Sequence, residues 1–337
     1  MSAVPQEQVE EYLLGSGIGR GLGRDEIRWK YYDEEFNRGR ERGYVWLSKG
    51  RVRGFVGWFP MTLATPAGDR DMVWTCDWSV EDSGSNPGIG ILLLTKVQKN
   101  YGFVGGVGGS ADSVSIVPRM RTRAVEGNAV PLRRPLRLRP FLEQAEKRLR
   151  FAPKLSATPL GALRMPRRGR PKGLPEASIR SGVDAAALAP LFDRPTDRLC
   201  KVRHDAAYLA WFGRCPLAEF KTVHLRHGSA AAGAVLWRLR DEANRWRVVF
   251  RSTRDGGAAL EGVVADVAGH LSRTPATLVS TIVSSHDGEA LRLLKRHGFI
   301  EAAERWPLYI SELEGADGCQ EGFADMSYLD TDLAFLR

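Results

Sequence analysis

The hydrophobic and polar positions of this 337-residue chain change their spacing several times in its first half. An alternating run rich in β-forming residues at 73–80 is followed by a polar segment at 81–90 that contains Asp, Ser, Asn, Pro and Gly. Apolar residues then begin a helix at 91–94, and a short strand follows at 101–105. The pattern predicts a strand, a glycine turn, a helix and a second strand in succession.

The glycine turn contains the first candidate chemistry. Gly88, Ile89 and Gly90 lie at the predicted N-terminus of the helix. Unbonded backbone N–H groups and the positive end of the helix dipole attract anions there, and glycine lets a phosphate approach the backbone closely. We interpret the turn as a phosphate cradle, with an ordinary strand-to-helix turn as the alternative.

The second half of the chain repeats this order of elements. A predicted hairpin at 224–237 corresponds to one at 45–58, and a strand at 245–250 leads into a glycine turn at 254–259. A helix and a further strand follow this turn, as they do in the first half. The repetition of one plan indicates an ancient duplication.

Charge marks a boundary between the two halves. Residues 132–175 contain thirteen Lys or Arg and two Glu, whereas the whole chain has a formal net charge of +9. The positive charge therefore belongs to this Pro- and Arg-rich segment. Because the chain is longer than a single core usually allows, we predict an N-terminal domain at 1–130, a basic linker at 131–175 and a C-terminal domain at 176–337.

These elements together resemble the GNAT superfamily of acyl-CoA N-acyltransferases. In that family the loop after the fourth strand has the pattern Gln/Arg-x-x-Gly-x-Gly/Ala and holds the pyrophosphate of acetyl-CoA. The first half keeps both glycines of this pattern but has Ser85 in place of Gln or Arg, and Arg254, Gly257 and Ala259 match it in the second half. The whole chain is similar to the tandem FemAB-like and exopolysaccharide-cluster acyltransferases.

The resemblance implies a fold, a cofactor and a set of site residues. The fold would be α/β (α+β), with two lobes that each hold a mixed, mostly antiparallel twisted sheet flanked by helices. Acetyl-CoA or another acyl-CoA would bind in the first lobe through Val80, Ser85, Gly88, Ile89, Gly90 and Ser110. The alternative cradle in the second lobe would consist of Arg254, Gly257 and Ala259.

A carboxylate on the fourth strand often serves as the base in this family, and Asp77 is the candidate here. Strand alternation puts Asp77 and Ser79 on one face, so Ser79 is the second catalytic candidate. A structural Asp bound to backbone amides or to an Arg is the alternative. The family's usual acid, a Tyr on the last helix, is missing, and the second half has Leu294 at that position.

The basic segment supports a separate hypothesis. Residues 166–173 resemble an AT-hook, whose Arg168-Gly169-Arg170 core would lie in the narrow minor groove of A·T-rich DNA. A solvated linker is the plain alternative. A third possibility is that the basic segment clamps the 3′-phosphate of CoA or an acidic, lipid-linked glycan precursor.

The remaining features narrow the class of protein. No apolar run is long enough for a membrane span, and the first residues lack the order of a signal peptide, so we predict a cytoplasmic protein. Four scattered cysteines without a Cys-x-x-Cys pair indicate reduced thiols. His224 and His227 would point to opposite faces of a strand, so we expect no metal site.

The sequence thus predicts an N-acyltransferase that transfers an acetyl group from acyl-CoA to a small amine by direct attack on the thioester. An amino sugar or an amino acid would be the acceptor. The alternative is a non-catalytic GNAT scaffold that uses its AT-hook-like linker to bind DNA or another polyanion. A steep salt dependence of binding would distinguish this second class.

Overall fold

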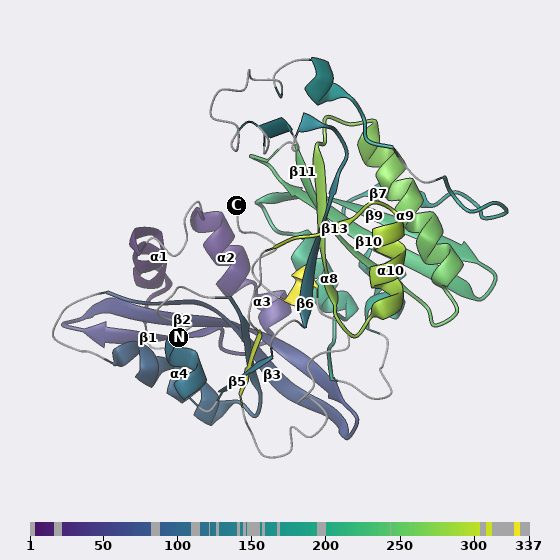
Figure 1. Cartoon of the computed structure of the whole chain (residues 1–337). Coiled ribbons are helices and arrows are strands. Elements are labelled where there is room, and N and C mark those ends of the chain that lie inside the picture. Colours follow the sequence, from purple (N-terminus) through teal and green to yellow (C-terminus); the bar gives the residue numbers. More distant parts are fainter. Residues whose placement is uncertain are drawn as a thin grey trace.

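The structure is a computed structural model of the chain. It describes residues 4–16, 22–81, 88–108, 115–120, 122–125, 128–139, 142–143, 146, 156, 159–166, 169–193, 200–242, 244–303, 308–311 and 327–330. In these residues two seven-stranded sheets lie side by side (Figure 1).

The first sheet has the order β1-β2-β3-β4-β14-β5, and β8 pairs with β2 outside this path. Its strands are β1 (Gly43–Ser48), β2 (Arg51–Thr65), β3 (Gly68–Val80), β4 (Val104–Val107), β5 (Thr122–Val125), β8 (Lys201–Val202) and β14 (Leu308–Ser311). Only β3 and β4 pair in parallel, and α4 (Ile89–Asn100) connects them.

The second sheet has the order β13-β6-β12-β11-β10-β9-β7. Its strands are β6 (Ala129–Pro135), β7 (Ser178–Ser181), β9 (Ala218–His227), β10 (Ala230–Leu239), β11 (Arg245–Ser252), β12 (Leu278–Ser284) and β13 (Ile300–Glu301). Here β11 and β12 form the parallel pair, and α9 (Gly257–Ser272) connects them. The predicted class, a mixed α/β fold with two mostly antiparallel sheets flanked by helices, is confirmed.

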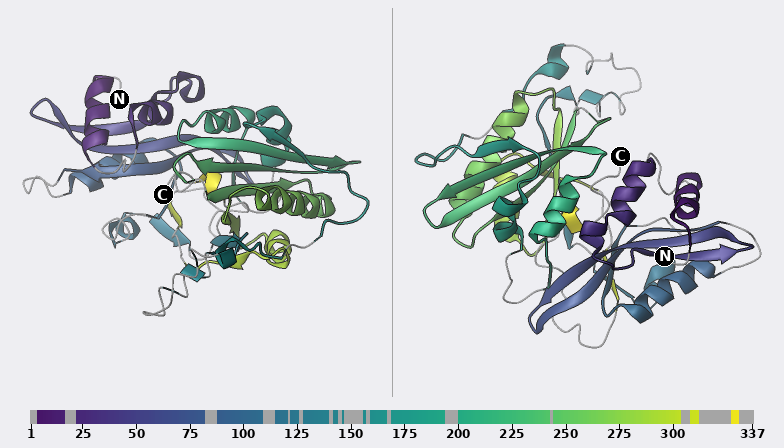
Figure 2. Two further views of the ribbon diagram at one scale, coloured as in Figure 1. Left: turned by 90° about the horizontal axis from the view of Figure 1, so that it is seen from above. Right: turned by 180° about the vertical axis from the view of Figure 1, so that it is seen from behind.

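Each sheet contains strands from the other half of the chain, namely β8 and β14 in the first sheet and β6 in the second. β14 lies between β4 and β5 in the first sheet, and β6 lies between β12 and β13 in the second. Figure 2 shows the yellow C-terminal segments at the junction between the two sheets. The predicted division at 130 and 175 stays a prediction, and these strands cross it.

Helices cover both faces of the second sheet. α9 and α10 (Gly288–Arg296) pack on one face, in a core that includes Leu236, Val248 and Val279. The neighbouring strand residues point to the other face because side chains alternate along a strand. There, Val235 and Val249 share a core with α7 (Ala185–Phe192), α8 (Ala206–Gly213) and the first half of the chain.

The N-terminal helices α1 (Gln6–Gly15), α2 (Arg24–Tyr32) and α3 (Glu34–Asn37) belong to this shared core. Trp29 of α2 and Trp211 of α8 stack with their ring centroids 4.7 Å apart. Each indole Nε1 donates a hydrogen bond to the backbone oxygen of the other residue, at 2.9 and 3.0 Å. This reciprocal contact binds the two halves together through equivalent groups.

The described residues also include the 3₁₀ turns η1 (Val117–Arg119), η3 (Pro159–Ala162) and η4 (Tyr328–Asp330). In η4, Tyr328 packs edge-on against Trp237 and donates a hydrogen bond to Ser280 Oγ at 3.0 Å. Asp330 Oδ1 lies 3.0 Å from His204 Nε2, and both side chains are fully buried. The C-terminal segment is therefore part of the core between the sheets.

The cysteines differ from the prediction in one respect. Cys76 and Cys215 are free and buried, as expected for reduced thiols. Cys200 is disulfide-bonded, so the prediction of four reduced thiols is wrong at this position. Sequence spacing could not indicate this bond, because a disulfide depends on which chain segments meet in the fold.

Candidate functional site

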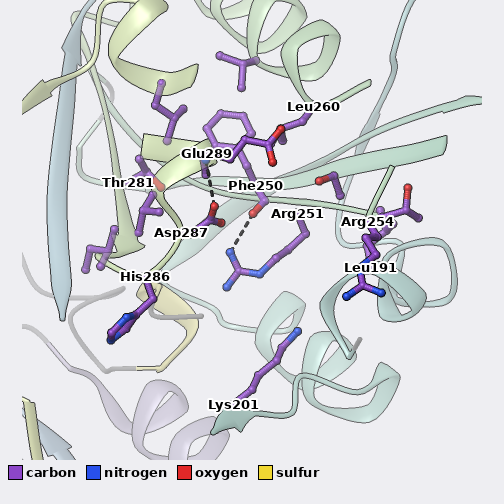
Figure 3. Close-up of a pocket in the computed structure, with 17 residues that line it drawn as sticks. Leu191, Lys201, Phe250, Arg251, Arg254, Leu260, Thr281, His286, Asp287 and Glu289 are labelled. Atoms are coloured by element: carbon purple, nitrogen blue, oxygen red, sulfur yellow. Dashed lines mark hydrogen bonds between the residues drawn. The ribbon is translucent and has the colours of Figure 1, made fainter. Parts of the chain in front are cut away.

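The ends of the parallel strands β11 and β12 form the site. The two strands pair from Arg245 and Leu278 as far as Arg247 and Ser280. Beyond these residues β11 pairs with β10, and β12 pairs with β6. A cavity of about 340 Å³ lies where the two strands part, next to the start of α9 (Figure 3).

One side of the cavity is apolar. It consists of side chains from β11, β12, α9 and α10, namely Phe250, Leu260, Val264, Val283, Ala290 and Leu294. Thr281 also lines this cavity, and its buried Oγ1 has no hydrogen-bond partner among the described residues. A buried hydroxyl of this kind is costly unless a ligand or water supplies the bond.

Cationic side chains line the cavity elsewhere. Arg251 follows Phe250 on β11 and therefore points toward α7, where its guanidinium lies 5.7 Å from the ring centroid of Phe192. Its NH1 group donates to the backbone oxygen of Phe250 at 2.9 Å. Lys201 reaches the cavity from β8 of the first sheet and is only 2% exposed. Both sheets thus contribute to one site.

Arg254 and His286 complete the polar lining at the two strand ends. Arg254 lies in the turn between β11 and α9, and His286 follows β12. Figure 3 shows Lys201, Arg254 and His286 on one side of the strand ends and the carboxylate of Glu289 on the other. Two guanidinium groups, the amino group of Lys201 and one imidazole therefore line the cavity.

The N-terminus of α9 is sterically tight. A Cβ at Gly256 would lie 2.7 Å from the backbone oxygen of Ala231, and one at Gly257 would lie 2.9 Å from Glu289 Oε1. The first turn of a helix leaves its N–H groups without an intrahelical acceptor. Glu289 lines the cavity, and its carboxylate lies against this helix end.

Asp287 is the second carboxylate of the cavity lining. It is the N-cap of α10, and its Oδ1 accepts a hydrogen bond from Ala290 N at 3.0 Å. This interaction is typical of an N-cap Asp and fixes the start of α10. We assign Asp287 to the architecture of the site for this reason.

The first-lobe residues predicted to hold the cofactor lie at the start of α4. Gly88 is the N-cap of α4 and has a φ of +97°, a conformation that favours glycine. Trp78 Nε1 donates to Gly90 O at 3.1 Å, so its indole lies beside this helix end. Val80 is the last residue of β3, next to this turn. Ser85 and Ser110 lie outside the described residues.

Asp77 and Ser79, the predicted catalytic residues, contact the N-terminal helices. Asp77 lies at the register shift between β3 and β2 and has a φ of +47°. Its Oδ2 accepts hydrogen bonds from Lys30 Nζ, at 2.6 Å, and from the hydroxyl of Tyr31. Ser79 accepts from the hydroxyl of Tyr12 through its backbone oxygen, at 3.2 Å. Asp77 Oδ2 is thus already bonded to two donors.

Burial and charge affect Tyr31 strongly. Desolvation raises the pKa of the Tyr31 hydroxyl well above its usual value, and the neighbouring charge of Asp77 raises this pKa further. Tyr31 therefore stays a neutral donor to the carboxylate. The Lys30–Asp77 pair is buried, with side-chain exposures of 6% and 9%.

The sequence named Arg254, Gly257 and Ala259 as the alternative cradle and gave no role to Lys201, Arg251 and His286. Arg254 lines the cavity, while Gly257 and Ala259 lie in the first turn of α9. Lys201 precedes Arg251 by fifty residues and belongs to the other sheet. The alternating pattern of β11 does place Arg251 opposite Phe250, and this was the one signal available.

The AT-hook-like segment is bound to the protein itself. The Arg170 guanidinium donates to Leu174 O, and its NH1 lies 3.8 Å from Glu176 and from Asp266 of α9. Gly169 is described next to it, and Arg168 lies outside the described residues. Insertion of Arg170 into a DNA groove would require these contacts to break.

No helix in the described part of the chain is long and apolar enough to cross a membrane. Within the same ranges, no group of three or more His, Cys, Asp or Glu side chains is placed to hold a metal ion.

The fold is that of the GCN5-related N-acetyltransferases. A GCN5-related N-acetyltransferase from Anabaena variabilis matches with a TM-score of 0.57 and 13% identity, over 90% of this chain and 71% of that chain. A conserved protein of unknown function from Enterococcus faecalis, described as a probable N-acyltransferase, matches with a TM-score of 0.58 and 8% identity, over 90% and 69%. Eis1 from Mycobacterium abscessus matches with a TM-score of 0.50 and 12% identity, over 90% and 72%. No protein-family model and no curated protein matches the sequence.

Proposed function

We propose that the chain is an acyl-CoA-dependent N-acyltransferase whose donor site is the cavity at the ends of β11 and β12. One observation carries the proposal: the cavity opens between two parting parallel strands at the N-terminus of α9, and Arg254 lines it. The fold supports the same class of activity, because the solved structures that match it include a GCN5-related N-acetyltransferase and a probable N-acyltransferase by description. The tandem, FemAB-like arrangement is part of this proposal, and the exchange of β6 and β14 supports it.

The residues of the cavity fit an acyl-CoA. Arg254 and the first-turn N–H groups of α9 would bind the pyrophosphate, since a helix N-terminus with a nearby guanidinium favours a phosphate. The apolar side would hold the pantetheine arm and the acyl group. The Thr281 hydroxyl would bond to a polar group of that arm. When bound, acetyl-CoA supplies an acyl group as a thioester that an amine can attack directly.

The acceptor would enter from the opposite side, between the sheets. Arg251 and Lys201 line this side, and α7 contributes Leu191. The attacking amine must be neutral, so a nearby base is required. The exposed imidazole of His286 is our candidate for taking up that proton.

Calorimetric titration of acetyl-CoA into the wild type, Gly257→Trp and Gly88→Trp tests the proposal. We expect the wild type to bind and Gly257→Trp to lose at least about 100-fold in affinity, since an indole would fill the helix end. Gly88→Trp should bind within about threefold of the wild type. Arg254→Gln provides a milder second variant, and circular dichroism checks that each variant folds.

The opposite pattern would assign the donor to the first lobe and to Val80, Gly88, Ile89 and Gly90. Absence of binding to the wild type would exclude an acyl-CoA-dependent activity for this chain. Salt dependence of binding to DNA would then test the polyanion hypothesis.

A further inference from the structure

A second cavity lies at a gap in the edge of the first sheet. β1 pairs with one edge of β2 as far as Gly57, and β8 pairs with the same edge at Leu63 and Ala64. Pro60 lies between these pairings and has no backbone N–H to donate to a strand there. A cavity of about 310 Å³ is lined by Pro60 and by residues of α3 and α8. Among the described residues it shares no lining residue with the donor cavity.

The carboxylates that line this cavity have partners within the protein. Asp69 and Asp193 pair with Arg203, with nitrogen–oxygen distances of 3.0 and 3.3 Å. Asp205 is the N-cap of α8, and its Oδ1 accepts a hydrogen bond from Tyr208 N at 2.7 Å. A carboxylate at this position is stabilised by the helix end that it caps. Each of the three carboxylates is therefore held by a group of the protein.

Arg38 and Arg40 supply the remaining positive charge of the lining. Arg38 is the C-cap of α3, and its guanidinium has no hydrogen-bond or ion-pair partner in the part of the chain that the structure describes. Arg40 Nε donates to Asn37 O at 3.3 Å. Partial desolvation, and next the charge of Arg38, lower the pKa of Arg40 against the opposite effect of Asp71 and Asp205. The two guanidinium groups are therefore close enough to repel each other.

We propose that this cavity binds the phosphate group of a small phosphorylated molecule, held between Arg38 and Arg40. A phosphate dianion matches two guanidinium groups in charge, and each guanidinium can donate two parallel hydrogen bonds to it. The cavity is within the size range of small-molecule sites, and the buried side chains of Phe36 and Met61 provide apolar walls beside the phosphate. The site does not depend on the proposed acyltransferase function.

Calorimetric titration of inorganic pyrophosphate into the full chain tests the proposal. We expect the wild type to bind it with a Kd below about 1 mM. Arg38→Gln and Arg40→Gln should each weaken this binding at least about tenfold, because each removes a charge-assisted hydrogen bond. Arg40→Lys keeps the charge but not the planar group, and should weaken binding only about threefold. Circular dichroism checks that each variant folds.

Two further variants test the charge of the cavity. Arg226→Gln is the matched control, since Arg226 is an exposed arginine on β9 of the second sheet, and it should leave the Kd within about twofold of the wild type. Asp69→Asn removes one carboxylate from the lining and leaves Arg203 with Asp193 as its partner. This variant should strengthen the binding of pyrophosphate about two- to fivefold.

The same titration in the presence of saturating acetyl-CoA identifies the source of the phosphate. We expect the binding that depends on Arg38 to persist, because the two cavities are separate. Its displacement by acetyl-CoA would mean that a phosphate of CoA occupies this cavity, and would overturn a separate site. A wild type that binds no pyrophosphate up to about 10 mM also overturns the proposal. So does binding that neither Gln variant weakens, or that Arg226→Gln weakens equally.

Discussion

The two parallel strand pairs of this molecule have the same connection but different surroundings. In the second sheet, β11 and β12 part at a cavity lined by side chains of both sheets. In the first sheet, Thr75 Oγ1 of β3 donates to Gly105 O of β4 at 2.9 Å, just beyond the last paired residues. Asp77 is bonded to α2, and Trp78 lies against Gly90. The side chains beyond the parting strands therefore differ between the two sites.

This comparison suggests that the two sites have different roles. In the described residues of the first site, polar groups bond mainly to one another, as in a structural core. In the second site, polar groups of the lining face a cavity large enough for part of a ligand. We propose that the first site supports the fold and the second site binds the donor. A duplication provides two copies of one unit, and the two copies can take different roles.

The Asp77→Asn variant tests most directly whether the first site has a structural role. The amide would leave the buried ammonium group of Lys30 without its counter-charge, and such a change costs about 3–5 kcal/mol. We expect urea unfolding to show this loss, while the Kd for acetyl-CoA of the folded protein is unchanged. Asp69→Asn is the control, because its ion pair with Arg203 is exposed and should contribute at most about 1 kcal/mol.

The opposite result would support the prediction from the sequence that Asp77 is a catalytic residue. If Asp77→Asn kept the free energy of unfolding but abolished acyl transfer, Asp77 would be a catalytic base and the first site would be the working one. The Lys30→Met variant provides a second readout, since it leaves Asp77 as the uncompensated buried charge. It should lower stability by a similar amount.

The Glu289→Gln variant tests whether the donor phosphate binds at the N-terminus of α9. Its carboxylate lies against Gly257 at the N-terminus of α9, where a phosphate of the donor would bind. Removal of this negative charge should raise the affinity for acetyl-CoA about two- to fivefold at low salt. The gain should shrink as salt rises, because exposed charges are screened.

Glu301→Gln is the matched control for Glu289→Gln. Its carboxylate pairs with Lys295 at 3.2 Å, beyond the other end of α10. Calorimetry at two salt concentrations measures both variants. An affinity for acetyl-CoA that falls in Glu289→Gln would contradict the placement of the donor phosphate at this helix end.

The local sequence pattern was sufficient to predict where helices begin, but it was not sufficient to predict which distant strands pair. α4 begins at Ile89 and α9 at Gly257, where the glycine turns predicted helix N-termini. The exchange of β6 and β14 was missed, because a run of four to seven residues shows its period but not its partner. The sequence assigned residues 131–135 to a linker for the same reason.

The same limit applied to the residues of the candidate site, since the local pattern does not show which distant segments come together. The pattern around Arg254 was recognisable because its residues are neighbours along the chain. Lys201 and Arg251 line one cavity although β8 joins the first sheet and β11 belongs to the second, so their positions depend on how the two sheets pack. The left-handed conformation of Asp77 was also invisible, since it depends on a register shift between β3 and β2.

The smallest effect that we expect concerns the two free cysteines. Burial raises the pKa of the Cys215 thiol to about 12, so at pH 8 only about one molecule in 10⁴ carries the reactive thiolate. Iodoacetamide should therefore alkylate Cys215 at least about 100-fold more slowly than an unperturbed thiol with a pKa of about 8.5. The rate should rise about tenfold per pH unit up to pH 10. A plateau near pH 9 would mean that Cys215 is not buried as described. Cys76 lies beside Tyr31 in the first site, so Asp77→Asn should speed its alkylation. Mass spectrometry of the two cysteine peptides measures both rates, and an unchanged rate for Cys76 would mean that the buried ion pair does not limit access to the first site.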